Sequence, residues 1–314
     1  MNTNTNTKLA VVAVASLLAV SGFGVSACSG GRSHGRVGGD GSTTGTGTDF
    51  ASTSTDGGGI VPDGCSDSAK LVYVVDQDET LYSFDVPSLK FTAVGQLACK
   101  ASFGATPFSM SVDRSATAWV LYSSGEMFQV STKDASCQAT SHQVGQAGLE
   151  NFGMGFASNS SGSTDETLYV AGGSASNAGT ASTSKFAKMT VPALSATTLG
   201  TVQGWPELTG TGKGELWGFF PSASVTPRVA QLDKVTGADG TVYPLDALSG
   251  TPSAWAFAFW GGNFYVFLQK ASDSSTSVYK VDGTTGVLTT ALSDTGKTIV
   301  GAGVSTCAPI GPIN

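Results

Sequence analysis

Charged residues, histidines and basic clusters are scarce in this sequence of 314 residues. Asp, Glu, Lys and Arg together make up 12% of it, about half of the usual share. The 16 basic residues never stand side by side, and the formal net charge is −7. Nucleic acids and anionic membrane surfaces are bound by clustered Lys and Arg that replace counterions, so the composition argues against both kinds of partner.

Long apolar runs are also missing, apart from one at the N-terminal end. Residues 9–20 are apolar and follow Lys8, but twelve residues are too few to cross a bilayer comfortably. A positive residue before a short apolar run is typical of an export signal, which we place at residues 1–27. The sequence therefore predicts an exported protein.

The end of this signal carries a recognisable motif. Val25-Ser26-Ala27-Cys28 resembles the lipobox of bacterial lipoproteins. The resemblance implies that Cys28 is diacylated, becomes the mature N-terminus and anchors the protein in the cell envelope. The alternative is an ordinary signal peptide with Cys28 as a bystander. The sequence does not distinguish the inner from the outer membrane.

Residues 29–64 are poor in the side chains that build a core. They contain twelve Gly, many Ser and Thr, and few large apolar residues. Such a segment cannot bury enough surface to offset the entropy lost on ordering. We expect residues 28–64 to be the lipidated cysteine with a flexible tether, and residues 65–314 to be the folded domain.

Glycine is plentiful, with 42 residues, and a short strand-and-turn pattern recurs five times in the predicted domain. Each copy has a polar third residue between apolar neighbours and ends in Asp, Ser or Thr, as expected of a strand followed by a turn. The copies are 81–85, 127–131, 186–190, 229–233 and 278–282. A second apolar strand precedes each copy, at 71–75, 119–122, 168–170, 216–220 and 264–268.

The spacing of these copies, 43 to 59 residues, fits a four-stranded blade of a β-propeller. Strands of smaller residues lie further upstream at 108–112, 152–156 and 255–259 and suit the crowded axis of a propeller. The first unit lacks such a strand, whereas residues 299–304 supply a spare one. We therefore predict an all-β propeller of five four-stranded blades, closed by the C-terminal strand. The alternative is a pair of β-sandwich domains.

Residues 111–119 look like the turn between the first and second strands in bacterial secreted propellers with degenerate NHL-like or quinoprotein-like repeats. Ser115 stands where Gly is usual in those repeats. The resemblance covers about residues 70–306. It implies the architecture and says almost nothing about activity, because such repeats serve many functions.

With Cys28 assigned to the lipid, four cysteines remain, and an even number in an exported protein favours disulfides. Three pairings are possible. Ring closure would bring Cys65 next to Cys307, and adjacent blades would bring Cys99 next to Cys137, so we predict these two bonds. A metal site is the rival interpretation, but there is no Cys-x-x-Cys pair, and His142 is the single histidine of the predicted domain. We predict no metal site and no cofactor.

Candidate ligand-binding residues follow from propeller geometry, since the connections leading into the innermost strands usually surround the site where ligands bind. These connections contain carboxylates, an amide and indole rings, which suit a sugar or a peptide. They are Glu150, Asn151, Trp205, Glu207 and Trp255. Alternatively, both Trp residues pack between blades and the Glu residues are solvated.

Three functions remain open at this stage. The first is a noncatalytic binding or scaffold module for a protein or carbohydrate ligand, held at the envelope by its lipid. The second is a propeller enzyme, such as a metal-dependent lactonase or lyase that uses clustered carboxylates. The third is a purely structural envelope component. We favour the first and assign no catalytic residue, because one histidine in the domain gives little support to most hydrolase schemes.

Overall fold

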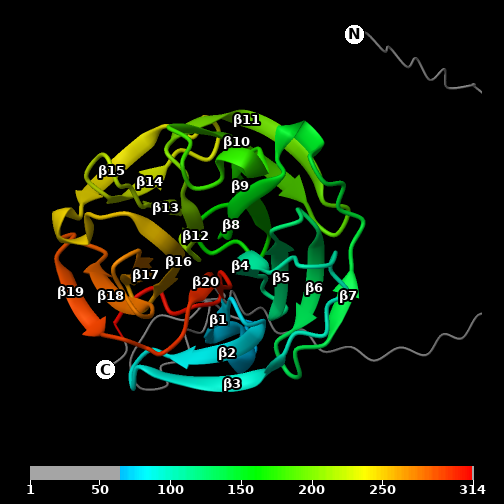
Figure 1. Ribbon diagram of the computed structural model, residues 1–314, viewed down its shortest axis with the longest axis horizontal. Helices are drawn as coiled ribbons and strands as arrows, with labels where there is room; N and C mark the ends of the chain where they lie inside the picture. The colour runs from blue at the N-terminus through cyan, green and yellow to red at the C-terminus, as the bar shows by residue number, and fades with distance from the viewer. Residues whose placement is uncertain (1–63, 313–314) are drawn as a thin grey trace, which may run out of the picture. The chain divides into compact units, whose positions relative to one another are not determined.

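Twenty strands form five four-stranded antiparallel sheets, arranged as blades around a central axis (Figure 1). The computed structural model describes residues 64–312. The predicted signal peptide, Cys28 and all but the last residue of the tether lie outside this range. In the described range, the all-β five-bladed propeller expected from the sequence is confirmed.

Four blades are built from consecutive strands that run outward from the axis. The second blade contains β4 (Pro107–Val112), β5 (Thr117–Tyr122), β6 (Met127–Ser131) and β7 (Cys137–Ala139). The third contains β8 (Asn151–Ser158), β9 (Glu166–Gly173), β10 (Thr183–Thr190) and β11 (Ser195–Gln203). The fourth contains β12 (Glu207–Gly210), β13 (Leu216–Phe220), β14 (Arg228–Leu232) and β15 (Asp239–Pro244). The fifth contains β16 (Pro252–Trp260), β17 (Asn263–Lys270), β18 (Ser277–Asp282) and β19 (Leu288–Leu292).

The first blade is assembled from both ends of the domain. Its inner strand is β20 (Ile299–Val304), followed outward by β1 (Val72–Asp76), β2 (Thr80–Asp85) and β3 (Lys90–Gln96). The strands β20 and β1 are antiparallel, with Val304 opposite Val72. This is the ring closure predicted from the spare C-terminal strand.

A disulfide between Cys65 and Cys307 joins residues 242 positions apart beside this closure, with their Cα atoms 5.8 Å apart. A second disulfide joins Cys99 to Cys137 and so links the first two blades. Both pairings are those expected from the sequence. Disulfides persist in oxidising compartments, so the two bonds indicate an extracytoplasmic location.

Short connections join the strands. Three of them contain a single turn of 3₁₀ helix, and a fourth such turn precedes β1. These are η1 (Asp67–Lys70), η2 (Gln146–Gly148), η3 (Ala175–Asn177) and η4 (Asp246–Leu248). In residues 64–312 no helix has the length and apolar character needed to cross a membrane.

The core consists of one large apolar cluster at each of the five interfaces between neighbouring blades. The cluster between the first and last blades includes Phe84, Tyr265 and Phe267, so the closing interface is packed like the other four. In the last blade Phe264 is buried as well, and Trp260 is half-buried.

The inner strands touch one another through their backbones, which explains their small residues. A Cβ atom on Gly153 would lie 2.1 Å from the carbonyl oxygen of Pro206, and one on Gly303 would lie 2.8 Å from the backbone of Ser111. Side chains at these positions would push the blades apart. Small residues near the axis are therefore a requirement of the ring.

Candidate functional site

All five inner strands begin at the same end of the ring. Because neighbouring strands in a blade are antiparallel, the loop that leads into each inner strand and the hairpin between the second and third strands share this end. We call this end the upper face and the opposite end the lower face. The five candidate residues precede an inner strand or lie in its first half, so they belong to the upper face.

Glu207 begins β12 and is the one charged residue in the inner strands of the described ring. It is 3% exposed. The hydroxyl of Ser109 in β4 donates to its carboxylate at 2.8 Å, and the backbone N–H of Met154 in β8 donates to it as well. One side chain thus connects the second, third and fourth blades across the axis.

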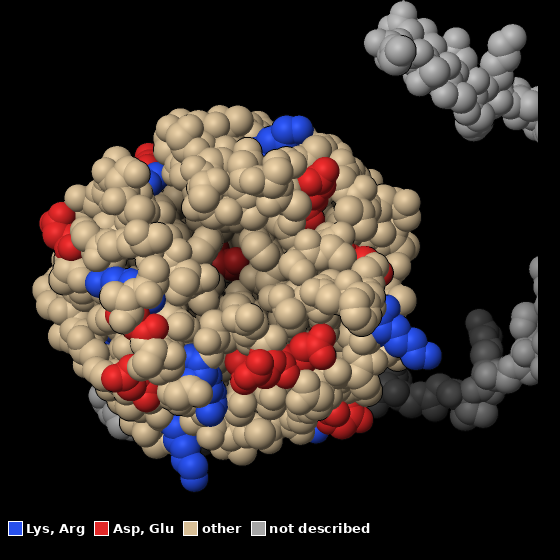
Figure 2. All heavy atoms as spheres, viewed as in Figure 1, with Lys and Arg blue, Asp and Glu red and all other residues tan. Residues whose placement is uncertain are grey.

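Burial raises the pKa of Glu207 well above the usual value for a glutamate, and the two hydrogen bonds offset only part of this effect. Figure 2 shows a hollow at the centre of the ring with acidic atoms at its floor. The inner strands supply a single acidic group, the carboxylate of Glu207. Its contacts lock neighbouring blades together.

Glu150 and Asn151 hold loops in place. Glu150 is partly exposed and accepts a hydrogen bond from the backbone N–H of Ala175 at 2.8 Å, which lowers the pKa of its carboxyl group. Asn151 is buried, and its Nδ2 donates to the carbonyl of Tyr122 at 3.3 Å. These residues link connections around the third blade and do not converge with Glu207 on one cavity.

Trp205 lines a cavity, and Trp255 lies against one of the residues that line it, so the two indole rings form no exposed aromatic platform. Trp205 is 2% exposed and lines the cavity described below. Trp255 is half-buried, and a Cβ atom on Gly179, which also lines that cavity, would lie 2.6 Å from its ring. Both indole N–H groups are buried and make no hydrogen bond within the described chain.

This cavity, the upper pocket, lies between the third, fourth and fifth blades and has a volume of about 470 Å³. Its walls come from the β9–β10 and β13–β14 hairpins and from the connections into β12 and β16. Trp205 and Phe220 are apolar residues of its lining, and the rim carries hydroxyl groups and Val225. The volume falls within the range of small-molecule sites.

Arg228 is the one charged side chain lining the upper pocket. It begins β14 and lies opposite Phe220 in the ladder between β13 and β14. Its guanidinium carbon is 4.0 Å from the centre of the Phe220 ring. Its Nη2 donates to Asp239 Oδ2 at 3.1 Å and to the carbonyl of Gln203 at 3.0 Å, whereas Nη1 has no partner among residues 64–312.

A second upper-face cavity, of about 450 Å³, lies between the first and fifth blades and is mostly polar. Asp76 and Asp294 contribute to it, and the Lys297 ammonium lies 4.8 Å from the ring centre of Tyr82. Asp76 accepts hydrogen bonds from Thr80 and Tyr82 within its own hairpin, and Asp294 accepts one from the Ser274 hydroxyl of the β17–β18 hairpin. No group of three or more His, Cys, Asp or Glu residues that could hold a metal ion occurs in the described chain.

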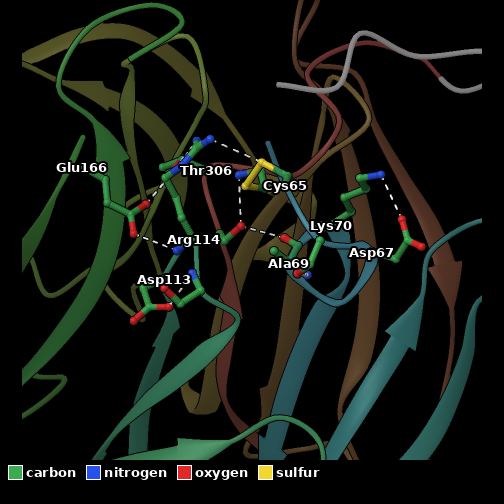
Figure 3. Close-up of a disulfide and its surroundings, with 12 residues drawn as sticks. Cys65, Asp67, Ala69, Lys70, Asp113, Arg114, Glu166 and Thr306 are labelled. Atoms are coloured by element: carbon green, nitrogen blue, oxygen red, sulfur yellow. Dashed lines mark hydrogen bonds and ion pairs between the residues drawn. A yellow bond between two sulfur atoms is a disulfide. The ribbon is translucent and has the colours of Figure 1, made fainter. Parts of the chain in front are cut away.

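The lower face carries a polar cluster beside the closing disulfide (Figure 3). Glu166 accepts a hydrogen bond from the backbone N–H of Arg114 at 2.8 Å and one from the hydroxyl of Thr306 at 2.8 Å. The Arg114 guanidinium donates to the same Thr306 hydroxyl at 3.1 Å and to Cys65 Sγ at 3.3 Å. The cluster ties the second and third blades to the closure.

Burial raises the pKa of Glu166 to about 7, while the hydrogen bonds from Arg114 and Thr306 act in the opposite direction. Nearby Asp113 raises this pKa further, and the Arg114 charge lowers it. The carboxyl group of Glu166 therefore changes charge near neutral pH.

Comparison with known proteins gives no match to a family profile and none among curated proteins. Similar solved structures include TolB from Acinetobacter baumannii, with 11% identity and a TM-score of 0.43 over 71% of this chain and 52% of that one. A protein of unknown function from Bacteroides thetaiotaomicron has 16% identity and a TM-score of 0.41 over 64% of this chain and 55% of its own. Another from Bacteroides caccae has 12% identity and a TM-score of 0.36, over 69% and 70% of the two chains.

Sequence reasoning found Trp205 but missed its neighbours Phe220 and Arg228. Phe220 ends a strand that the sequence predicts, and Arg228 begins the next strand after an eight-residue separation. An isolated arginine at a strand end carries no motif. The available signal was that Arg114 and Arg228 are the only two arginines in the predicted domain.

Proposed function

We propose that this protein is a noncatalytic binding module that is held at the cell envelope by a lipid on Cys28. The fold supports this proposal because a closed propeller is a rigid frame that presents loops on one face. The observation that carries it is the upper pocket, where Trp205 from the connection into β12 meets Phe220 and Arg228 from the β13–β14 hairpin around one cavity of about 470 Å³.

The expected tether fits this role. A flexible chain of 36 residues has a root-mean-square reach of roughly 30 to 35 Å, enough to keep a domain clear of lipid headgroups. Acyl chains contribute about 0.8 kcal/mol per buried methylene, so a diacylated cysteine anchors the protein without a membrane-spanning helix. In this proposal residues 65–314 are the propeller, with repeats of the degenerate NHL-like or quinoprotein-like type.

The lipid is tested by a Cys28→Ser variant of the full chain expressed in a bacterium that processes lipoproteins. We expect the wild-type protein to float with membranes and to show an acyl mass increment, and the variant to lose both. A variant that retains both properties would contradict the anchor at Cys28.

The pocket is tested with a fragment set of neutral sugars, aromatic amines, aromatic carboxylates and N-acetyl amino acids, followed by ligand-observed nuclear magnetic resonance. Ser182 is exposed and lines the pocket, so Ser182→Trp adds bulk to the rim without disturbing the core. Ser272 is exposed on the β17–β18 hairpin, and Ser272→Trp is the matched control.

We expect at least one fragment to bind the wild-type protein and the Ser272→Trp control, and to lose binding in Ser182→Trp. Fragments that bind all three proteins equally would contradict the assignment of the upper pocket as the ligand site. An absence of binding by the whole set would contradict it too.

A further inference from the structure

We propose that the upper pocket binds an apolar carboxylate, with the carboxylate on Arg228 and the apolar group against the apolar rim at Val225. This inference rests on the proposed function and adds the chemical class of the ligand. It is carried by the geometry of Arg228, its charge and the apolar lining beneath it.

The guanidinium of Arg228 is fixed before any ligand arrives. One of its faces lies on the Phe220 ring, and Nε and Nη2 are held by Asp239 and by the backbone of Gln203. Stacking and hydrogen bonding remove the flexibility that makes an arginine costly to order on binding. Nη1 remains as a donor without a partner in the described chain, and the side chain is 17% exposed.

The charge of the pocket contrasts with that of the molecule. The chain has a net charge of −7, yet the one charged side chain lining this pocket is cationic. Asp239 offsets part of that charge, so the pocket suits a single negative group more than a multiply charged phosphate. A carboxylate matches a planar guanidinium and accepts short charge-assisted hydrogen bonds from it.

The remaining lining favours an apolar group beside the carboxylate. Phe220 and Trp205 are almost fully buried, so their ring faces are not free to stack on a sugar. Val225 continues the apolar surface toward the rim and is 65% exposed. A small apolar side chain or ring that covers this surface would remove it from water and gain affinity.

Two sources supply this chemistry: a free apolar acid and the C-terminus of a peptide. The probes are 3-phenylpropionate for the first source, and N-acetylphenylalanine with an acetylated tripeptide ending in phenylalanine for the second. N-acetylphenylalaninamide is the neutral control, because it keeps the shape and removes the charge. Tighter binding of the tripeptide than of 3-phenylpropionate would identify a peptide end, and the reverse order a free acid.

Isothermal titration calorimetry of these probes at low salt tests the proposal. We expect N-acetylphenylalanine to bind at least about tenfold more tightly than its amide, as expected for a hydrogen bond to a charged group. Arg228→Gln should abolish this preference, so that the acid and the amide bind the variant with equal affinity. Lys133→Gln, at an exposed position on the β6–β7 turn, removes the same charge elsewhere and should leave the preference intact.

Asp239→Asn gives a second test that keeps Arg228 in place. Removing the carboxylate that offsets the guanidinium should tighten N-acetylphenylalanine binding several-fold, even if Arg228→Gln folds poorly. Equal affinities for acid and amide, or weaker acid binding by Asp239→Asn, would overturn the carboxylate assignment. Fragments that bind in the pocket without any preference for acids would overturn this inference alone, whereas failure of the Ser182→Trp test would remove the proposed function with it.

Discussion

Glu166 offers a quantitative test of how the ring is closed. Its pKa in the folded protein is about 7, whereas a free glutamate has a value near 4.5. The folded protein therefore holds a proton more tightly than the unfolded chain does. The stability that this proton contributes is complete below pH 4.5 and is lost as the pH rises through 7. A difference of this size corresponds to at most about 3 kcal/mol.

The perturbation is Glu166→Gln, which keeps the shape and a partner for Thr306 but cannot ionise. The assay is urea unfolding of both proteins between pH 4 and pH 8, followed by tryptophan fluorescence. We expect the free energy of unfolding of the wild-type protein, minus that of the variant, to fall by up to about 3 kcal/mol from pH 4 to pH 8.

Glu150→Gln is a control of opposite sign. The hydrogen bond from Ala175 lowers the pKa of Glu150, so any stability it contributes is present at neutral pH and is lost as the pH falls through its folded pKa. If the free energies of unfolding of the wild-type protein and of Glu166→Gln differ by the same amount from pH 4 to pH 8, the argument that the Glu166 carboxyl group ionises beside the closure is refuted.

Three further predictions concern the ring itself. Replacing Cys65 and Cys307 by Ser should lower the free energy of unfolding by about 5 kcal/mol in urea, because the bond closes a loop across 242 positions; no change would contradict the closure. Deleting residues 297–314 removes the inner strand of the first blade and should lower the melting temperature sharply in calorimetry; an unchanged temperature would speak against it. Gly153→Ala should lower the free energy of unfolding in urea by about 3 kcal/mol, because the new Cβ would lie 2.1 Å from a backbone oxygen. Gly240→Ala, where the nearest atom to the new Cβ is 3.4 Å away, should lower it by under about 1 kcal/mol. Equal losses in the two variants would contradict the close packing at the axis.

Most of the architecture could be predicted because each blade of the propeller repeats a similar local sequence pattern. The third strand of every blade has a polar residue between apolar neighbours, and the second strand is a largely apolar run. Four of the five inner strands stand out by their small residues. β12 was missed because Glu207 and Thr209 make this four-residue strand look like a loop. Its polar side chains are explained by tertiary contacts, since Glu207 accepts from Ser109 and Thr209 accepts from the backbone N–H of Phe259.

The candidate site could be predicted from the sequence only in part, and the reason is physical. The order of the strands along the chain shows which residues lead into the inner strands, and on this basis Trp205 and Glu207 were predicted as ligand-binding residues. It does not tell which hairpins from neighbouring blades fold over the same cavity. Arg228 reaches the upper pocket through its stacking on Phe220 and its bonds to Asp239, and these contacts join residues that carry no shared pattern in the sequence.

The upper pocket as the ligand site is the central claim, and hydrogen–deuterium exchange of the full chain tests it most directly. The measurement compares the free protein with the protein saturated by the fragment that binds most tightly. We predict slower exchange at the backbone amides of residues 179–182, 203–205 and 220–225, which line the pocket. Slower exchange confined to the cavity between the first and fifth blades, or to the lower face, would contradict the claim.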